Sequence, residues 1–508
     1  MDFSTLDIIA FIGFIAAVVA ISLFASRNEK TDEDYFLAGR NLSWWLIGFS
    51  LIASNISTEH FVGMAGRGYE LGLAIASYEW MAAVTLVVVA LFFLPRFLRS
   101  GIYTIPEFLE HRYSVGARTL MAFMLMIAYI FVALASVLYS GALALEQIFG
   151  LDLVMGIWLI GIIAGVYTVY GGLKAVVWSD LIQGIALLLG GVLITLLAFN
   201  EIGGWDAFVA ASGDKLHVVL PWNHDEMPWV AVFIGGLWIP NLFYWGLNQF
   251  ITQRTLGAKS LAEGQKGIFL AAAIKLFIPF IIIFPGIIAG ELYASEIGQA
   301  DAAYPILMKN LLPAGLKGIM FAALFGAVLS SLDSMLNSAS TIWTMDLYKR
   351  HIKPNAKSKQ LVRIGRTMTA AFVIIGCLWA PVISSFDGVF NYMQMIWGFI
   401  SPGIVVAFMF GLISKKTPPV AAIGGMILGF PVYGLLLWLL PDIAFLHHMM
   451  FTGLILAAFM GFMRYTRPLA EPVVLVDAGV VDLEPNPTAK IWGGLVILAT
   501  AILYIIFW

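Results

Sequence analysis

The sequence predicts an all-α membrane protein with 14 transmembrane helices. Composition is the first observation, because 61% of its 508 residues are hydrophobic and 12% are charged, which a soluble globule would have to expose widely. Long uninterrupted apolar runs are the second, and they exclude a membrane β-barrel, whose strands alternate in short segments. The third is that lysine and arginine collect in every second loop.

A helix needs about 20 apolar residues to cross the hydrocarbon core, and each expected span satisfies that length. The split between the tenth and eleventh spans depends on the turn signal Phe386-Asp387-Gly388. The expected spans are 5–25, 44–66, 71–95, 119–148, 152–170, 175–199, 229–251, 267–290, 316–345, 368–386, 388–413, 420–440, 446–463 and 490–508.

Alternate loops hold 23 of the 28 basic residues, and these loops are expected to be cytoplasmic. Both termini then lie on the outer side of a plasma (inner) membrane. The first apolar run, Ile8–Phe24, is expected to stay as a span, because Met1–Asp7 lacks the basic start of a signal peptide. Cys377 is the single cysteine, so neither an intramolecular disulfide nor a thiol metal site is expected.

Two spans carry signals of interrupted helices. A polar run from Ser54 to His60 lies in the span 44–66, and Pro240 lies in the span 229–251. Five spans separate them, so the two segments cross in opposite directions, which is typical of an inverted repeat with its binding site at the broken helices. We expect a first extra helix and loop at 1–43, five-helix repeats at 44–199 and 200–413, and three extra helices at 414–508.

Several motifs resemble the sodium/glucose (galactose) cotransporters of the sodium–solute symporter family, and its bacterial sodium/galactose cotransporters above all. The similarity covers nearly the whole chain, and it implies a 5+5 inverted-repeat core resembling the leucine transporter fold, with alternating access. The motifs are Tyr35-Phe-Leu-Ala-Gly-Arg40, Ala53-Ser-Asn-Ile-Ser57, Phe61-Val-Gly-Met-Ala-Gly66, Ala76-Ser-Tyr-Glu-Trp80, Tyr170-Gly-Gly-Leu-Lys-Ala-Val-Val-Trp-Ser-Asp180, Tyr244-Trp-Gly-Leu-Asn-Gln249, Gln253-Arg254, Ser330-Ser331, Met335-Leu-Asn-Ser338, Thr344-Met-Asp-Leu-Tyr348 and Tyr392-Met-Gln394.

The resemblance implies a sugar site and gates. A pyranose offers hydroxyls that donate and accept, which suits a mixture of carboxylate, ammonium and amide groups. At position 60 a histidine replaces the glutamine of the bacterial carriers, which leaves the hydroxyl preference open. The implied substrate ligands are Asn55, His60, Glu79, Asn241, Lys275 and Gln394; the implied gates are Met64, Tyr78 and Phe390 on the outside and Tyr244 on the inside.

The resemblance also implies a sodium site, built from the backbone carbonyls of Ala53, Ile56 and Ala327 and the hydroxyls of Ser330 and Ser331. Sodium prefers hard oxygen ligands, and a broken helix frees such carbonyls. Asp180 matches a family aspartate near the sodium path. Asp333 departs from the family pattern, and because two carboxylates at one depth repel each other, the pair predicts a second cation site.

Plainer structural alternatives accompany these predictions. Asn55 and Asn241 could join helices by hydrogen bonds, Glu79 and Lys275 could form a buried ion pair, and Asp333 could face an inner watery vestibule or be protonated. A channel would show rings of charge, and an enzyme would need a nucleophile, base or metal constellation, which the scattered histidines do not form.

The predicted function is therefore a sodium-coupled symporter, not an enzyme, that imports a hexose such as glucose or galactose across the lipid bilayer, with sodium as its ion and no nucleic-acid partner. The alternatives are a sodium symporter for another polyol such as myo-inositol, and a sodium-independent sugar facilitator. The sequence leaves open which hexose is carried, whether one or two sodium ions move, and the oligomeric state.

Overall fold

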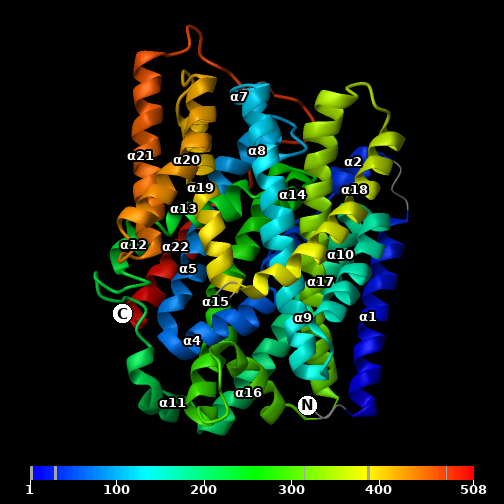
Figure 1. Ribbon diagram of the computed structural model, residues 1–508, viewed down its shortest axis with the longest axis vertical. Coiled ribbons are helices and arrows are strands. Elements are labelled where there is room, and N and C mark those ends of the chain that lie inside the picture. The colour runs from blue at the N-terminus through cyan, green and yellow to red at the C-terminus, as the bar shows by residue number, and fades with distance from the viewer. Residues whose placement is uncertain (1–3, 28–30, 314, 386–388, 476) are drawn as a thin grey trace.

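The computed structural model describes residues 4–27, 31–313, 315–385, 389–475 and 477–508. Within these ranges the chain is almost entirely helical, and the helices form one elongated bundle (Figure 1). Both termini lie in the lower half of that view, while α7 and the connection between α21 and α22 lie at the top. The turn at 386–388, used to separate two expected spans, lies outside the described residues.

Among the described residues, twelve helices are long and apolar enough to cross a membrane. Two of the 14 expected spans do not meet that criterion as single helices, and both have a structural reason. The segment 44–66 is interrupted, and 152–170 forms the first part of a longer helix that bends at Gly172. The predicted class, a helical membrane bundle, is confirmed.

The first expected repeat starts with a discontinuous helix. Helix α3 (Trp44–Asn55) ends where Ile56 takes extended dihedrals (φ −81°, ψ 105°), and a π-helical segment (Glu59–Met64) leads into α4 (Ala65–Leu71). The polar run Ser54–Thr58 explains the break, because short polar side chains offer the backbone alternatives to helical hydrogen bonds. The neighbouring helices are α1 (Thr5–Ser26), α2 (Asp32–Leu37), α5 (Ser77–Val88), α6 (Leu94–Arg99), α7 (Ile105–Arg112), α8 (Val115–Ile127) and α9 (Ala135–Phe149).

Helix α10 (Leu153–Ile202) contains two expected spans, 152–170 and 175–199, joined by a bend rather than a loop. Gly172 sits at the bend with φ 53° and ψ −163°, dihedrals that a side chain would strain. Both parts reach α17 (Leu316–Ile342): Thr168 of the first part bonds Asp333, and Asp180 of the second bonds Ser330.

The second expected repeat also has a discontinuous helix, made of α12 (Trp229–Phe233), α13 (Trp238–Leu242), a π-helical segment (Phe243–Leu247) and α14 (Gln249–Leu256). The interruption was expected, but its cause is not Pro240. That proline lies in the first turn of α13, where no backbone donor is needed. The chain leaves helical geometry at Ile234–Gly236 and again at Asn248, whose ψ is 119°.

The remaining helices surround this framework. They are α11 (Trp205–Ser212), α15 (Leu261–Tyr293), α16 (Ala303–Leu311), α18 (Ser358–Trp379), α19 (Val389–Ile413), α20 (Pro419–Leu439), α21 (Phe445–Thr466) and α22 (Ala489–Ile506). Cys377 of α18 is 1% exposed, and its thiol faces the Ile157 carbonyl at 3.7 Å.

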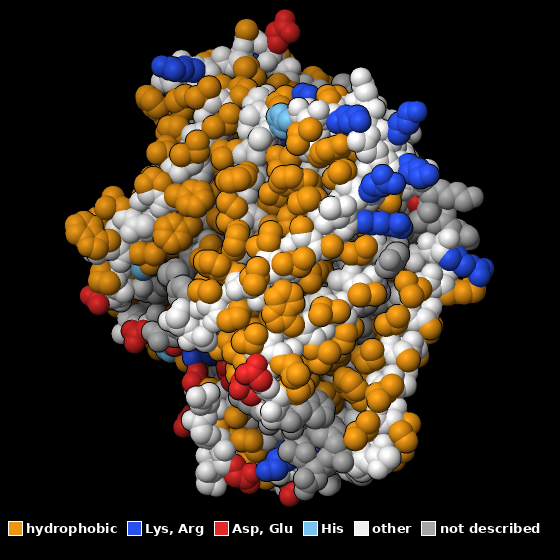
Figure 2. Space-filling model, turned by 45° about the vertical axis from the view of Figure 1, so that its right-hand side comes forward, with side chains coloured by type: hydrophobic (Ala, Val, Ile, Leu, Met, Phe, Trp, Pro, Cys, Tyr) orange, Lys and Arg blue, Asp and Glu red, His pale blue; other side chains and the backbone are white. Residues whose placement is uncertain are grey.

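Charge and apolar surface are separated along the long axis. Figure 2 shows a broad belt of hydrophobic side chains, with lysine and arginine gathered on its upper right and most of the visible aspartate and glutamate lower down. The expected orientation follows from this asymmetry. The upper end in Figure 1, called the basic end below, is therefore predicted to face the cytoplasm.

Candidate functional site

The end of α3 carries the first part of the site. An α-helix leaves its last carbonyls without intrahelical partners. The break after Asn55 does this in the middle of the bundle, and the Ala53 carbonyl accepts a hydrogen bond from the Ser330 hydroxyl at 3.2 Å. The structure thus brings together two of the residues predicted to bind sodium, one from each expected repeat.

Ser331 lies beside Ser330 on α17 and is 1% exposed, yet its hydroxyl has no hydrogen-bond partner among the described residues. A buried unpaired hydroxyl costs free energy unless a ligand or water completes it. Ala327 precedes these serines by three and four residues, so the three positions share one helix face. Ile56 caps α3. All five predicted sodium ligands therefore belong to α3 or α17.

The second part of the site is a cluster around Lys275 of α15. This lysine is fully buried, and its ammonium donates hydrogen bonds to Asn55 Oδ1 and Glu79 Oε2. The Asn55 amide in turn donates to the Tyr244 hydroxyl at 3.0 Å, which connects the two discontinuous helices. The Trp245 ring centroid lies 4.9 Å from the Lys275 ammonium. Four predicted site residues thus form one continuous polar network.

His60 extends this cluster. Its Nε2 lies 3.6 Å from Glu79 Oε1, which is too long for a hydrogen bond, and its buried Nδ1 has no partner within the described part of the chain. The two imidazole nitrogens of His60 therefore offer polar atoms that a hydroxyl-bearing ligand can bind. Asn241 behaves differently, because its amide donates to the Leu237 carbonyl, 3.0 Å away in its own segment.

Of the predicted gates, Tyr244 belongs to the polar network, and Met64 and Tyr78 are partly buried against the core. The side chains of Phe390 and Gln394 lie outside the described part of the structure. Their roles stay predictions.

Asp180 is fully buried and is surrounded by polar side chains of α3, α14 and α17. Its carboxylate accepts hydrogen bonds from Ser50, Ser54 and Ser330. Arg254 of α14 contributes its guanidinium at 3.1 Å from Asp180 Oδ2. The sequence places Arg254 in a motif without assigning it a role, because its pairing with Asp180 is a long-range contact that no local pattern reveals.

Arg254 changes the argument for a second cation site. The repulsion expected between Asp180 and Asp333 called for a cation, and the chain supplies one to Asp180 itself. Asp333 is 0% exposed and accepts a hydrogen bond from the Thr168 hydroxyl. It therefore does not face a watery vestibule in this structure, and a second cation there stays a prediction.

Gln183 is a residue that the sequence interpretation missed. It follows Asp180 by three residues on α10, is 1% exposed, and packs against α17 at Gly326. Neither atom of its amide has a partner among the described residues. An amide at membrane depth, one helical step from an aspartate, is the signal that could have identified it.

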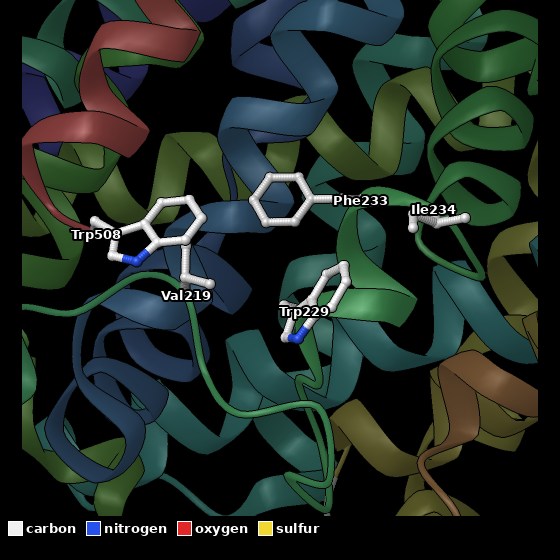
Figure 3. Close-up of a pocket in the computed structure, with 5 residues that line it drawn as sticks. All are labelled: Val219, Trp229, Phe233, Ile234 and Trp508. Carbon is white, nitrogen blue, oxygen red and sulfur yellow. The ribbon is translucent and has the colours of Figure 1, made fainter.

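A separate apolar groove of about 590 Å³ opens near the end of α22 (Figure 3). Phe233 is the last residue of α12 and Ile234 follows it, and in this view Phe233 lies between Trp508 and Ile234. The lining residues are Val219, Trp229, Phe233, Ile234 and Trp508, and the predicted ligands are not among them. This groove is therefore distinct from the polar site.

Comparison with known proteins shows the family. The model of the sodium:solute symporter family matches residues 35–429. A sodium/glucose cotransporter of Vibrio parahaemolyticus is 42% identical, over 99% of this chain and 98% of that protein. The human sodium/myo-inositol cotransporter 2 is 34% identical, over 83% of this chain and 68% of its own length.

Among solved structures, the substrate-bound outward-open state of a Na⁺-coupled sialic acid symporter superposes with a TM-score of 0.83 at 24% identity, covering 92% of this chain and 99% of that one. This likeness confirms the fold, which is of the leucine transporter type. The chain therefore belongs to the sodium:solute symporter family, as a multi-pass membrane protein that couples solute transport to sodium.

Proposed function

We propose that this symporter imports a neutral hexose, glucose or galactose, together with sodium. The observation that carries the proposal is the polar cluster of Lys275, Glu79 and Asn55 between the two discontinuous helices. The ammonium only donates hydrogen bonds, the carboxylate only accepts them, and the amide does both, so the cluster matches the mixed hydroxyls of a sugar.

The charge balance of the cluster supports a neutral solute. Lys275 and Glu79 offset each other, so an anionic substrate would meet the carboxylate without a free counter-charge. Recognition of a carboxylate commonly uses a guanidinium fork. The buried Arg254 does not offer one here, because it already binds Asp180, Ser50 and Ser334.

Sugar binding would change contacts that the structure shows. A sugar hydroxyl would bind both His60 Nε2 and Glu79 Oε1. An apolar face of the sugar would pack on the Tyr244 ring, whose hydroxyl accepts a hydrogen bond from Asn55. The proximity of Asn55 to Ala53 then connects the sugar and sodium sites within one helix end. Ordering this end for one ligand favours the other.

The experiment is uptake of labelled glucose, galactose and myo-inositol into proteoliposomes under a sodium gradient and a matched choline gradient. Saturable, sodium-dependent uptake of one hexose that exceeds myo-inositol supports the proposal. Uptake of each sugar at equal rates in sodium and choline would contradict sodium-coupled sugar import.

Myo-inositol is the second candidate, and His60 is the position at which the resemblance leaves the hydroxyl preference open. The bacterial sugar carriers that this chain resembles have glutamine at this position, and human sodium/myo-inositol cotransporter 2 is among the relatives. Substituting His60→Gln should shift preference toward galactose if this residue selects the hydroxyl pattern. An unchanged ratio of hexose to inositol uptake would remove His60 from that role.

The membrane orientation is part of the same proposal, with both termini outside the inner membrane. A cysteine placed at Asp214 should react with an impermeant thiol reagent added to intact cells, and one at Lys353 should react only after permeabilisation. The opposite pattern would invert the topology.

A further inference from the structure

Arg40 closes the motif Tyr35–Arg40, to which neither sugar nor sodium binding assigns a role. Its side chain is 5% exposed, although it lies in a connection between helices at the basic end. The guanidinium donates to Glu33 Oε1 at 2.9 Å and to three backbone carbonyls: Leu256 at 3.2 Å, Gly101 at 2.8 Å and Ile102 at 3.1 Å. Four hydrogen bonds thus converge on one planar group.

These carbonyls mark the ends of the elements that carry the site. Leu256 is the last residue of α14, which continues the second discontinuous helix. Gly101 and Ile102 follow α6, which continues the helix that holds Glu79. Arg40 itself precedes α3 by a few residues. A cation suits the end of α14, because the last carbonyls of a helix carry partial negative charge.

The backbone around Arg40 is held in an unfavourable conformation. Ala38 and Arg40 have φ of 51° and 48°, in the left-handed region that residues with a Cβ rarely adopt. Such a conformation persists only where its surroundings fix it. Ala38 caps α2 through the hydrogen bond of its amide to the Glu33 carbonyl, whereas Arg40 is held by its guanidinium contacts, so loss of those contacts would release Arg40.

A second connection lies directly beside the first. The Leu42 amide donates to the Gly257 carbonyl at 3.0 Å, and the Lys259 amide donates to the Leu42 carbonyl at 3.2 Å. The chain that enters α3 is thus paired with the chain that leaves α14. These two hydrogen bonds hold the two segments together at the basic end.

We propose that Arg40 is a positioning residue for the transport cycle, which fastens the ends of the two discontinuous helices and keeps the path from the basic end closed. Release of its carbonyl contacts accompanies opening on that side. The inference rests on sodium-coupled symport by the family fold and is independent of which solute is carried.

The test uses Ala258→Cys as a reporter, because Ala258 is 0% exposed and lies at the pairing with Leu42. The native Cys377 is buried, and the protein without the reporter supplies the blank. Proteoliposomes of known orientation are treated with an impermeant charged thiol reagent from the basic side, with sodium and without sugar. We expect Arg40→Gln to raise the modification rate at least tenfold and Arg40→Lys to raise it less, because lysine keeps the charge but not the fork.

Arg112 provides the matched control. It is a buried arginine at the same end, and it donates to the carbonyls of Gly411 at 3.0 Å and Thr417 at 3.3 Å, near the end of α19. Arg112→Gln should lower thermal stability without raising the modification rate. A reporter rate in Arg40→Gln equal to that of the parent, or an equal rise in both glutamine variants, would overturn the proposal. If Arg40→Gln does not fold, Arg40→Lys decides by the same comparison.

Discussion

Substituting Glu79→Gln separates two roles for the buried pair of Glu79 and Lys275. The side chain keeps its volume, but an acceptor-only carboxylate becomes an amide with two donors. The Lys275 ammonium, which is fully buried, then loses its counter-charge. The substitution would impair both a structural ion pair and a sugar site. A second variant is therefore needed to distinguish the two roles.

The substitution is expected to change two quantities, the stability of the protein and its affinity for sugar. Removing one partner of a buried ion pair costs about 3–5 kcal/mol of stability, because the remaining charge is uncompensated. A hydrogen bond from a sugar hydroxyl to a charged group is worth about 1.5–3 kcal/mol. Since about 1.4 kcal/mol is one decade of affinity, the half-saturating sugar concentration should rise roughly 10–150-fold.

The assay compares Glu79→Gln with the double variant Glu79→Gln, Lys275→Met, by thermal unfolding and by sodium-driven uptake. Removing both charges should restore much of the stability, because replacing a buried ion pair with neutral groups is often tolerated. Uptake should stay low if the pair binds substrate. Recovery of uptake in the double variant, or near-normal uptake by Glu79→Gln alone, would refute the ligand role and leave a structural ion pair.

Further predictions concern sodium, stoichiometry and pH. Sugar should bind at least tenfold tighter in sodium than in choline by isothermal titration, because both sites share the end of α3; equal affinities would exclude this coupling. Ser331→Ala should weaken sodium activation of uptake while leaving the protein folded, since its buried hydroxyl has no hydrogen-bond partner among the described residues; unchanged activation would remove it from the site. With about 2.3 kcal/mol from a 100 mV potential and about 1.4 kcal/mol from a tenfold gradient, one sodium supports roughly 500-fold accumulation and two support its square. The predicted second cation at Asp333 gives a sodium-to-sugar flux ratio of two that falls to one in Asp333→Ala; a ratio of one in the unaltered carrier would remove that site. Burial alone would raise the pKa of Glu110, but hydrogen bonds from Arg350 and Arg118 hold it below the usual 4.5, so its stabilising effect is present above that pH and is lost as pH falls through the lowered value. Glu110→Gln should therefore lower the melting temperature at pH 7 and make no difference well below pH 4.5; a difference that persists in acid would contradict this origin.

The break in α3 was predictable from the sequence because its cause is local. Asn55, Ser57 and Thr58 are polar residues in an otherwise apolar run, and each disfavours an uninterrupted helix. The second interruption shows where local patterns fail. A Cβ on Gly236 would lie 1.6 Å from the Leu446 carbonyl, so this glycine is required by the approach of α21, which no nearby residue signals.

The pairing of Arg254 with Asp180 illustrates the same limit within the site. The positions are 74 residues apart, and composition shows only that both are charged and lie in or near spans. The motif Gln253-Arg254 indicates that Arg254 is important to the family, but it does not identify the partner of this side chain. The contact between Lys275 and Glu79, by contrast, was foreseen as one of two alternatives, because few charges lie at that depth and opposite ones attract.

The buried thiol of Cys377 makes this carrier convenient for spectroscopy. With one native cysteine, held against α10 inside the bundle, fluorophores or spin labels introduced at chosen surface pairs should attach with little background. Distances between α4 and α16 at one end, and between α2 and α20 at the other, can then be followed without removing a native cysteine as sodium and solute are added. If the distance at one end increases while the distance at the other end decreases, the carrier alternates access between its two ends. Such changes can be recorded in single molecules and in real time.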